Sequence, residues 1–164
     1  MSSITYVDGD ATCPVFTTNK AIITHIVNDV NCWGSGFVMA LSNKWKEPEE
    51  GFHKASAPHN GPSMMQLGKV QIIKVEPNIY VANLVAQHMV GEDEYGEAPI
   101  RYDALIVCLC KISNAIKAFG GSISVHMPRM GAGLARGRWE IIEPIVRIEL
   151  CERGIPVTVY DWKG

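Results

Sequence analysis

Apolar positions along the chain alternate between short strand-like runs and one long helical stripe. Residues 21–27 (AIITHIV) form a run rich in β-branched side chains, which is typical of a strand. Between residues 100 and 119, large apolar side chains recur at steps of 4, 3, 4 and 3, which predicts a helix with one buried face. These side chains are Leu105, Leu109, Ile112, Ile116 and Phe119. Two glycines at residues 120–121 are expected to end this helix.

The same pattern predicts further strands and helices in alternation. Strand-like runs cover residues 4–7, 70–75, 79–85, 122–127 and 155–160. Three further segments have a composition that favours a helix, namely residues 37–44, a short stretch near 49–54, and residues 139–153. Strands separated by helices predict an α/β fold with a largely parallel or mixed sheet and helices on both of its faces. We expect one domain over residues 1–164.

Composition narrows the class of protein further. Hydrophobic residues make up 47% of the chain, and 15 basic residues stand against 17 acidic ones for a formal charge of −2. Low charge with high apolar content excludes disorder as the main state. The same balance argues against binding through a broad basic face, as in non-specific binding of duplex DNA. It remains compatible with a small polyanion held by backbone amides at helix starts.

The chain shows no sign of export, membrane insertion or a metal centre. Its longest uncharged stretch, residues 77–91, is 15 residues long and contains polar side chains, so it is too short to span a bilayer. The five cysteines are an odd number without metal-ligand spacing, and reduced thiols are the simpler interpretation. We therefore expect a cytoplasmic protein without membrane association, metal or cofactor.

Two glycine-containing loops follow predicted strands, at the position where such sheets bind ligands. The first, residues 28–36, carries Asn28 and Asn31, whose amides offer both donors and acceptors. The second, residues 128–137, contains Gly131 and Gly133, and successive N–H groups there can form a nest for an anion. Because Asn and Gly are also ordinary turn residues, each loop alone is compatible with a plain connection.

Two ionisable side chains lie close to these segments. Asp10 follows the first strand and is suited either to accept a hydrogen bond from an exocyclic amine, such as that of adenine, or to cap a turn. His25 directly precedes the first loop, where an imidazole can exchange protons near neutral pH, or can be a buried strand residue bonded to a neighbour. Apart from Asp29, the sequence places no other ionisable group near that loop.

Four arginines offer cations that could reach a phosphate group. For any one of them, a solvated surface position is the simpler interpretation. They are Arg101, Arg129, Arg136 and Arg138.

Taken together and in order, these motifs resemble the macro domain. The resemblance is carried by residues 6–12 (YVDGDAT), 26–31 (IVNDVN) with 34–36 (GSG), and 127–134 (MPRMGAGL). It covers almost the whole chain, through residues 157–161. Within that family the chain is most similar to small single-domain members, the ADP-ribose-1″-phosphate phosphatases and the terminal ADP-ribose glycohydrolases.

The resemblance implies a three-layer α/β/α fold and a monomer that binds ADP-ribose or a derivative of it. By that likeness Asp10 and Ala11 would contact adenine, and Tyr160 or Trp162 would flank it. The residues expected around the distal ribose are Asn28, Asn31, Gly34, Ser35 and Gly36. Those expected to wrap the diphosphate through backbone N–H groups are Gly131, Ala132, Gly133 and Leu134.

The resemblance also implies a reaction, the hydrolysis of ADP-ribose-1″-phosphate to ADP-ribose and phosphate with His25 as general acid and base. The terminal glycohydrolase type uses a lysine after the fourth strand and an aspartate after the GxGL turn. Here residues 84–88 (LVAQH) contain no lysine and Ala135 follows the turn, so the lysine-dependent reaction is not expected. Two alternatives remain: a non-catalytic ADP-ribose-binding module, and an ADP-ribosyl hydrolase acting on modified protein or nucleic acid.

Overall fold

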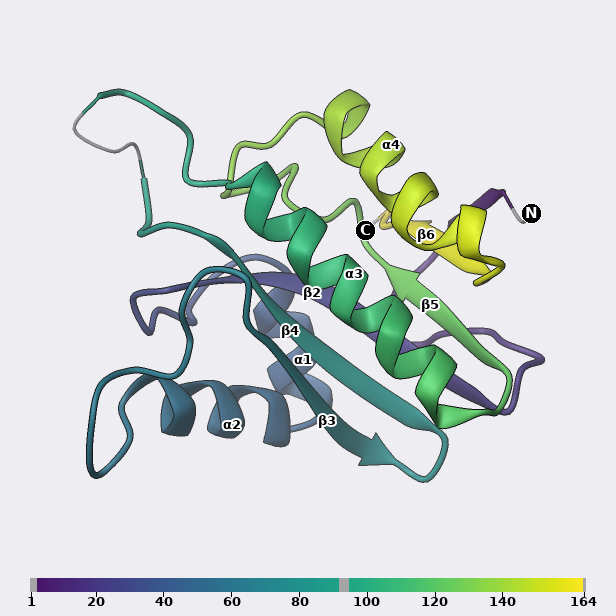
Figure 1. Ribbon diagram of the computed structural model, residues 1–164, viewed down its shortest axis with the longest axis horizontal. Coiled ribbons are helices and arrows are strands. Elements are labelled where there is room, and N and C mark those ends of the chain that lie inside the picture. Colours follow the sequence, from purple (N-terminus) through teal and green to yellow (C-terminus); the bar gives the residue numbers. More distant parts are fainter. Residues whose placement is uncertain (1–2, 92–94, 164) are drawn as a thin grey trace.

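A six-stranded sheet forms the centre of the computed structural model, which describes residues 3–91 and 95–163 (Figure 1). The strand order is β1-β6-β5-β2-β4-β3, and all neighbours pair in parallel except β3 and β4, which are antiparallel. The strands are β1 (Ile4–Asp8), β2 (Lys20–Asn28), β3 (Val70–Glu76), β4 (Ile79–Gln87), β5 (Ile123–Met127) and β6 (Val157–Asp161). The helices are α1 (Phe37–Lys44), α2 (Glu47–Ser56), α3 (Tyr102–Phe119) and α4 (Trp139–Glu149).

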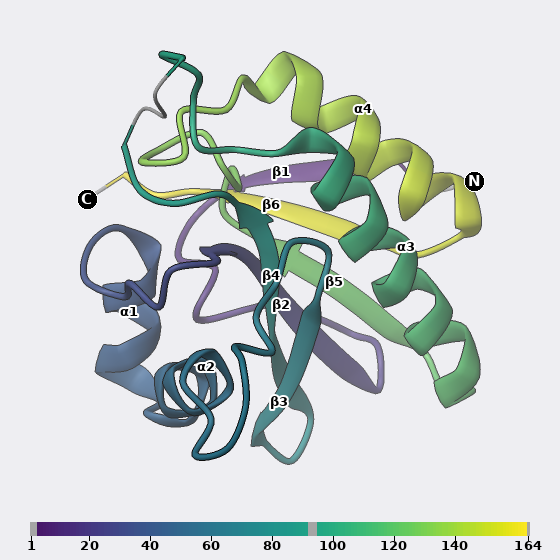
Figure 2. The ribbon, with the colours of Figure 1, turned by 60° about the vertical axis from the view of Figure 1, so that its left-hand side comes forward.

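The helices form two layers on opposite faces of the sheet, as Figures 1 and 2 show. Helices α3 and α4 cover one face, and α1 and α2 cover the other over strands β2, β4 and β3. The predicted α/β class with a mixed, mostly parallel sheet between helices is therefore confirmed. No helix among residues 3–91 and 95–163 is long and apolar enough to cross a membrane.

Most predicted elements are found within two residues of their expected bounds. The helix predicted at the C-terminal end is shorter than expected, because α4 ends at Glu149 and residues 151–153 form a separate 3-10 turn before Gly154. The short helix expected near residues 49–54 is longer, since Pro48 occupies its first turn, where a missing N–H costs nothing. Residues 92–94 of the acidic loop at 91–99 lie outside the described residues.

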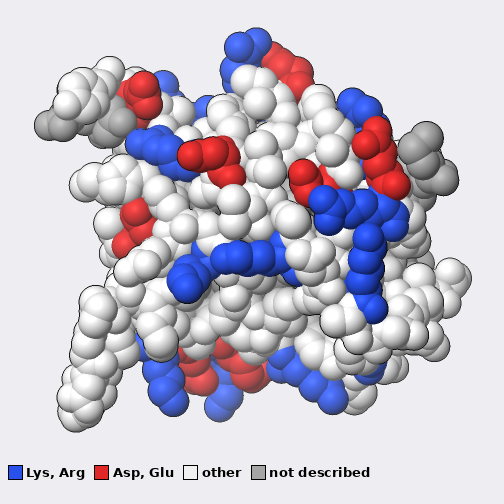
Figure 3. Space-filling model, viewed as in Figure 1, with Lys and Arg blue, Asp and Glu red and all other residues white. Residues whose placement is uncertain are grey.

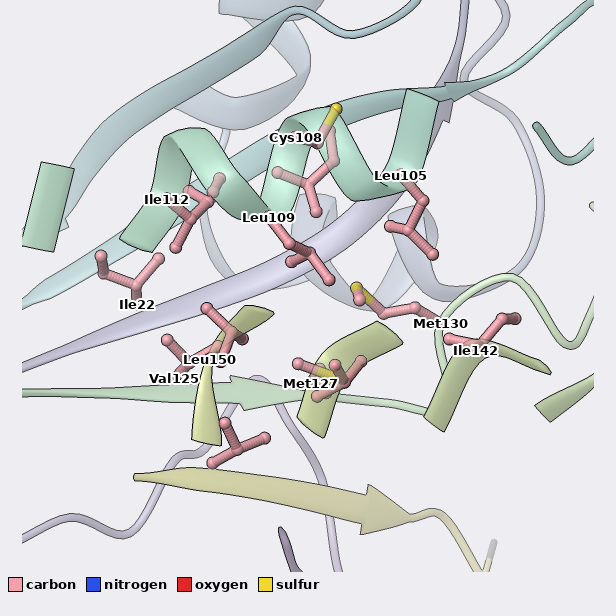
Figure 4. Close-up of a cluster of buried hydrophobic side chains, with 14 of the residues drawn as sticks. Ile22, Leu105, Cys108, Leu109, Ile112, Val125, Met127, Met130, Ile142 and Leu150 are labelled. Carbon is pink, nitrogen blue, oxygen red and sulfur yellow. The ribbon is translucent and has the colours of Figure 1, made fainter. Parts of the chain in front are cut away.

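The apolar stripe of α3 builds the larger core. Leu105, Leu109 and Ile112 are fully buried and point from α3 toward side chains of β5 and α4, as Figure 4 shows. Gly120 takes the left-handed conformation (φ 80°) that ends the helix. On the outer side of α3 and α4, basic and acidic side chains are interspersed among uncharged ones (Figure 3).

The smaller core lies under α1 and α2 and reaches the first loop. Trp33, from that loop, is buried against Phe52 of α2 with a ring separation of 5.4 Å. Ile23 of β2 and Val81 of β4 form the floor of this cluster. The first loop is therefore anchored by burial of one of its own side chains.

Parallel pairing brings the predicted loops to one edge of the sheet. Strand β2 lies between β4 and β5 and runs parallel to both. Their carboxyl ends, Asn28, Gln87 and Met127, therefore lie at the same edge, as expected for a ligand site in an α/β sheet. The loops that follow these strands surround the candidate site.

The core packing leads to a stability prediction. Replacing Leu109 with alanine leaves a cavity between α3 and the sheet, and we expect the free energy of unfolding to fall by about 2–5 kcal/mol. Urea denaturation measures this change. Ile106→Ala, on the exposed side of the same helix, is the control and should cost about 1 kcal/mol or less. Equal losses in both variants would contradict the assignment of the buried stripe.

Candidate functional site

Two adjoining cavities open at the edge where the strand ends meet. The larger has a volume of about 890 Å³ and is lined by both predicted loops and by His25 and Gln87. The smaller, about 410 Å³, is lined by the turn at residues 9–11 and by Tyr160 and Trp162. Three residues line both cavities, namely Gly36, Phe37 and Pro128. The pair is large enough for an elongated small molecule.

Asn28 shapes the first loop. Its side-chain oxygen accepts hydrogen bonds from the N–H groups of Val30 (3.1 Å) and Cys32 (3.0 Å), and its amide nitrogen donates to the Cys32 carbonyl (2.7 Å). The side chain thus satisfies three backbone groups of a tight loop while it lines the larger cavity. Gly34, Ser35 and Gly36 line the same cavity, in agreement with their expected placement.

Asn31 is placed differently from the other predicted residues of the first loop. It has a positive φ of 60°, and it lies outside the lining of both cavities. Its side-chain oxygen instead faces His53 of α2, 2.6 Å from Nδ1. Asn31 therefore connects the loop to a helix.

The second loop contains two glycines at positions where a residue with a side chain would clash with its neighbours. Gly131 has a φ of 76°, and a Cβ there would lie 2.6 Å from the Ile100 side chain. A Cβ on Gly137 would lie 2.7 Å from the same Ile100 side chain. The backbone N–H of Gly137 donates a hydrogen bond to the Gly131 carbonyl (2.6 Å). Gly133, by contrast, faces open space. Packing thus requires Gly131 and Gly137, whereas nothing in the fold requires Gly133.

The two loops face each other across the larger cavity. Leu134 is 63% exposed, and its Cδ1 lies 3.7 Å from the position that a Cβ on Gly36 would occupy. Gly131, Gly133 and Leu134 line the cavity as expected, whereas Ala132 does not.

Arg129 anchors the second loop to the end of β6. Its guanidinium makes two hydrogen bonds to Asp161, at 2.6 Å and 3.1 Å. It also lies over the rings of Tyr6 (5.1 Å) and Trp139 (5.5 Å). The hydrogen bond from Arg129 lowers the pKa of Asp161. Arg129 is thus held by protein partners and is more constrained than the solvated surface arginine expected from the sequence.

His25 lies in the wall of the larger cavity and is only 2% exposed. Its Nε2 bonds to the side-chain oxygen of Asn83, and the Asn83 amide nitrogen donates to Pro48 and Gln71 carbonyl groups. Because an amide oxygen only accepts, Nε2 carries the proton and Nδ1 has a free lone pair. Burial lowers the pKa of His25 to about 4, although the bond to Asn83 opposes this shift.

The remaining nitrogen of His25 is unusual. Nδ1 is buried and has no hydrogen-bond partner among residues 3–91 and 95–163. The His25 ring packs edge-on against Trp33 (5.4 Å) and at a tilt against Phe37 (5.9 Å). The structure confirms that His25 is a buried strand residue bonded to a neighbour, and it also places His25 at the border of the candidate site. The expected exchange of protons near neutral pH is not supported, because burial lowers its pKa to about 4.

The smaller cavity contains the residues expected at its end of the site. Asp10 and Ala11 line it together with Tyr160 and the 70% exposed Trp162. The Asp10 carboxylate accepts hydrogen bonds from the Thr12 N–H (2.9 Å) and hydroxyl (2.8 Å). Asp10 therefore caps a turn and lines a cavity at the same time.

Two histidines that the sequence did not place near the first loop contact it. His53 of α2 contacts Asn31, and His88, just after β4, bonds through Nδ1 to Asp29 (2.7 Å). The expectation that His25 and Asp29 are the only ionisable groups near this loop is therefore wrong. The pairing of β4 with β2 could have suggested His88, but no local signal indicated His53.

Comparisons with known proteins found solved structures with the same fold. No family model matches the chain. A protein of unknown function from Bacteroides thetaiotaomicron is 46% identical with a TM-score of 0.91, and each chain covers 98% of the other. A macrodomain protein from Streptomyces coelicolor is 39% identical with a TM-score of 0.79, over 97% of this chain and 99% of that one.

More distant matches extend the comparison. DarTG from Thermosipho africanus, solved in complex with ADP-ribose, has a TM-score of 0.72 at 20% identity, over 98% of this chain and 42% of that one. At that identity the likeness concerns the fold alone. Chromodomain-helicase-DNA-binding protein 1-like from Danio rerio is 31% identical over 99% of this chain. The chain spans only 16% of that relative.

No cluster of three or more His, Cys, Asp or Glu side chains in the described part of the chain is arranged to hold a metal ion. The polar side chains that line the two cavities include amides and hydroxyls, together with Arg129 and Arg136 in the larger cavity and Asp10 in the smaller one. Such a site can bind and orient a ligand by hydrogen bonds.

The buried state of His25 predicts how stability changes with pH. The unfolded chain takes up a proton on His25 near its usual pKa of 6.5, whereas the folded chain does so only at about 4. The contribution of His25 to stability is therefore complete above about pH 6.5 and falls as the pH drops toward 4, by roughly 2 kcal/mol between about pH 7.5 and pH 5. Urea denaturation at the two pH values measures this loss.

Matched variants identify the residue responsible. His126 is also buried, its pKa is lowered to about 4, and it contributes with the same sign. We expect His25→Gln to reduce the loss of stability by roughly half, and His59→Gln, at an exposed position, to leave it unchanged. A full loss in His25→Gln would show that the neutral state of His25 is not the cause.

Proposed function

Because the chain belongs to the macrodomain family, we propose that it binds ADP-ribose. The observation that carries this proposal is the joined pair of cavities, with Asp10 at one end and Asn28 at the other. An elongated ligand with a base at one end, a diphosphate in the middle and a sugar at the other matches this arrangement. The ADP-ribose complex of the Thermosipho africanus neighbour supports the choice of ligand.

The smaller cavity would hold adenine. The Asp10 carboxylate has acceptor capacity beyond its two bonds to Thr12 and would accept a hydrogen bond from the exocyclic amine. Ala11 would contribute its backbone, and the rings of Tyr160 and Trp162 would flank the base.

The second loop would hold the diphosphate. Gly133 faces open space, so the ligand can approach the backbone closely, and oriented N–H groups there favour an anion. Arg129 is occupied by Asp161 and would position the loop rather than neutralise the phosphates. We therefore expect the affinity to depend only mildly on salt. The distal ribose would lie against Asn28 and the backbone of residues 34–36.

A hydrolytic activity on ADP-ribose-1″-phosphate is a finer proposal, favoured by the unpartnered Nδ1 of His25 at the cavity wall. His25 would accept a proton from water while the water oxygen bonds to phosphorus. The bond between phosphorus and the sugar oxygen breaks, and that oxygen takes up the proton held by His25 to give ADP-ribose and phosphate, which returns His25 to its neutral form. A neutral ring with a free lone pair on Nδ1 is suited to the role of base in the attacking step.

Calorimetric titration with ADP-ribose tests the binding proposal. Gly133→Ala adds a methyl group where the diphosphate would lie, so we expect roughly tenfold weaker binding with unchanged stability. Gly121→Ala, in an exposed turn after α3 with ordinary contacts, is the matched control. Absence of binding by the wild-type chain at high micromolar ligand would refute the proposal.

Phosphate release from ADP-ribose-1″-phosphate tests the hydrolytic proposal. We expect His25→Ala to lower the rate by about a hundredfold or more, because a general base contributes about that much. Circular dichroism would verify that the variant is folded. Equal rates would remove His25 from this role, and no release by either protein would leave a non-catalytic ADP-ribose-binding module.

A further inference from the structure

A chain of hydrogen bonds runs from the start of β2 to Tyr160, which lines the smaller cavity. The Thr18 hydroxyl, just before β2, donates to the Lys20 carbonyl (2.9 Å) and lies 2.8 Å from the Ser124 hydroxyl of β5. Ser124 bonds to Nε2 of His126 (2.7 Å), and Nδ1 of the same ring lies 2.8 Å from the hydroxyl of Tyr160 in β6. These residues meet because β5 lies between β2 and β6 in the sheet (Figure 2).

The carbonyl at one end determines the direction of every bond in this chain. The Lys20 carbonyl only accepts, so the Thr18 hydroxyl uses its one proton there and accepts a bond from Ser124. Ser124 then has no proton left for His126, so Nε2 carries the ring proton and donates it. Burial lowers the pKa of His126 to about 4, so the ring is neutral near neutral pH and Nδ1 has a free lone pair. The Tyr160 hydroxyl therefore donates to Nδ1.

The orientation of the His126 ring is determined by its two partners. Turning the ring over about its Cβ–Cγ bond would place carbon atoms against both hydroxyls and break both bonds. His126 is only 1% exposed, and the ring of Phe16 packs edge-on against it at 6.0 Å. Buried polar groups without partners are destabilising, so the observed orientation is strongly preferred.

The hydroxyl of Tyr160 is engaged by the protein on both sides. It donates to His126 and accepts from the backbone N–H of Val15 (3.0 Å). Tyr160 is 5% exposed and lines the smaller cavity. Because the hydroxyl has no proton left for a ligand, Tyr160 offers the cavity its ring rather than a hydrogen-bond donor.

We propose that His126 is a positioning residue that, by accepting a hydrogen bond from the Tyr160 hydroxyl, holds the Tyr160 ring in place as a wall of the pocket for the base. This inference rests on the proposed binding of ADP-ribose. His126 lies outside the lining of both cavities, so it acts on the ligand only through Tyr160. A ring that is already held in place needs no ordering when a flat base arrives, which favours binding.

Two substitutions of His126 separate positioning from stability. In asparagine the amide oxygen is bonded to Cγ, as Nδ1 is in histidine, so His126→Asn keeps an acceptor for the Tyr160 hydroxyl and loses the bond to Ser124. In glutamine the amide lies one atom further out, as Nε2 does, so His126→Gln keeps the bond to Ser124 and loses the acceptor for Tyr160. Both variants remove the buried ring, and we expect urea denaturation to show similar losses of stability.

Calorimetric titration with ADP-ribose compares the two variants. We expect His126→Gln to bind about three- to tenfold more weakly than the wild type, and His126→Asn to stay within about twofold of it. Adding Tyr160→Phe to His126→Gln removes the unpaired hydroxyl and keeps the ring, so the double variant should recover most of the lost affinity. His59→Gln, at an exposed position, is the control with wild-type affinity.

A purely structural role for His126 gives a different result. The affinities of His126→Asn and His126→Gln would then fall together with their stabilities, and the double variant would recover nothing. Either observation, in a wild-type protein that binds ADP-ribose, overturns the inference and leaves the proposed function intact. Absence of binding by the wild type refutes the proposed function and this inference with it.

The tautomer of His126 in the ligand-free wild-type protein gives a readout that needs neither ADP-ribose nor a folded variant. Long-range proton–nitrogen correlation spectra show which nitrogen of the ring carries the proton. We expect a proton on Nε2 and none on Nδ1 near neutral pH. A proton on Nδ1 would mean that Tyr160 accepts from His126 instead of donating to it, and it would overturn the inference whether or not ADP-ribose binds.

Discussion

The parallel pairing of β2 with β4 and β5 is the constraint on which the candidate site depends. It delivers three strand ends to one edge of the sheet, and with them the loops that form the larger cavity. The rest of the fold serves to hold these loops. Trp33 is buried against α2, Arg129 is bound to Asp161, and Gly131 is packed against Ile100, so each loop is anchored by a contact outside itself.

The candidate site offers a ligand mostly uncharged groups. With a formal charge of −2, the chain has no excess of cations, and Arg129, one of two arginines in the second loop, is paired with Asp161. The buried imidazole at the cavity wall is neutral because burial lowers its pKa to about 4. Oriented amides cost no reorganisation when an anion arrives, which explains how a nearly uncharged chain can be suited to a diphosphate ligand.

Local sequence signals anticipated the parts of this arrangement that depend on neighbouring residues. The stripe from Leu105 to Phe119 and the β-branched run in β2 follow the periods of helix and strand. Glycine spacing indicated the second loop, and the order of motifs indicated which cavities the loops would line. The sequence did not indicate that Asn31 faces α2, because its contact with His53 joins residues 22 positions apart.

By itself, the sequence determined the elements, the fold class and the loops where a ligand can bind, because backbone geometry ties these to residues a few positions apart. Only the tertiary structure decided which side chains meet. Contacts such as His25 with Asn83, 58 residues apart, and Arg129 with Asp161, 32 residues apart, follow from strand order and helix packing. The same packing decides the protonation of His25 and the contact between Asn31 and His53, since both depend on burial and partners that no local pattern encodes.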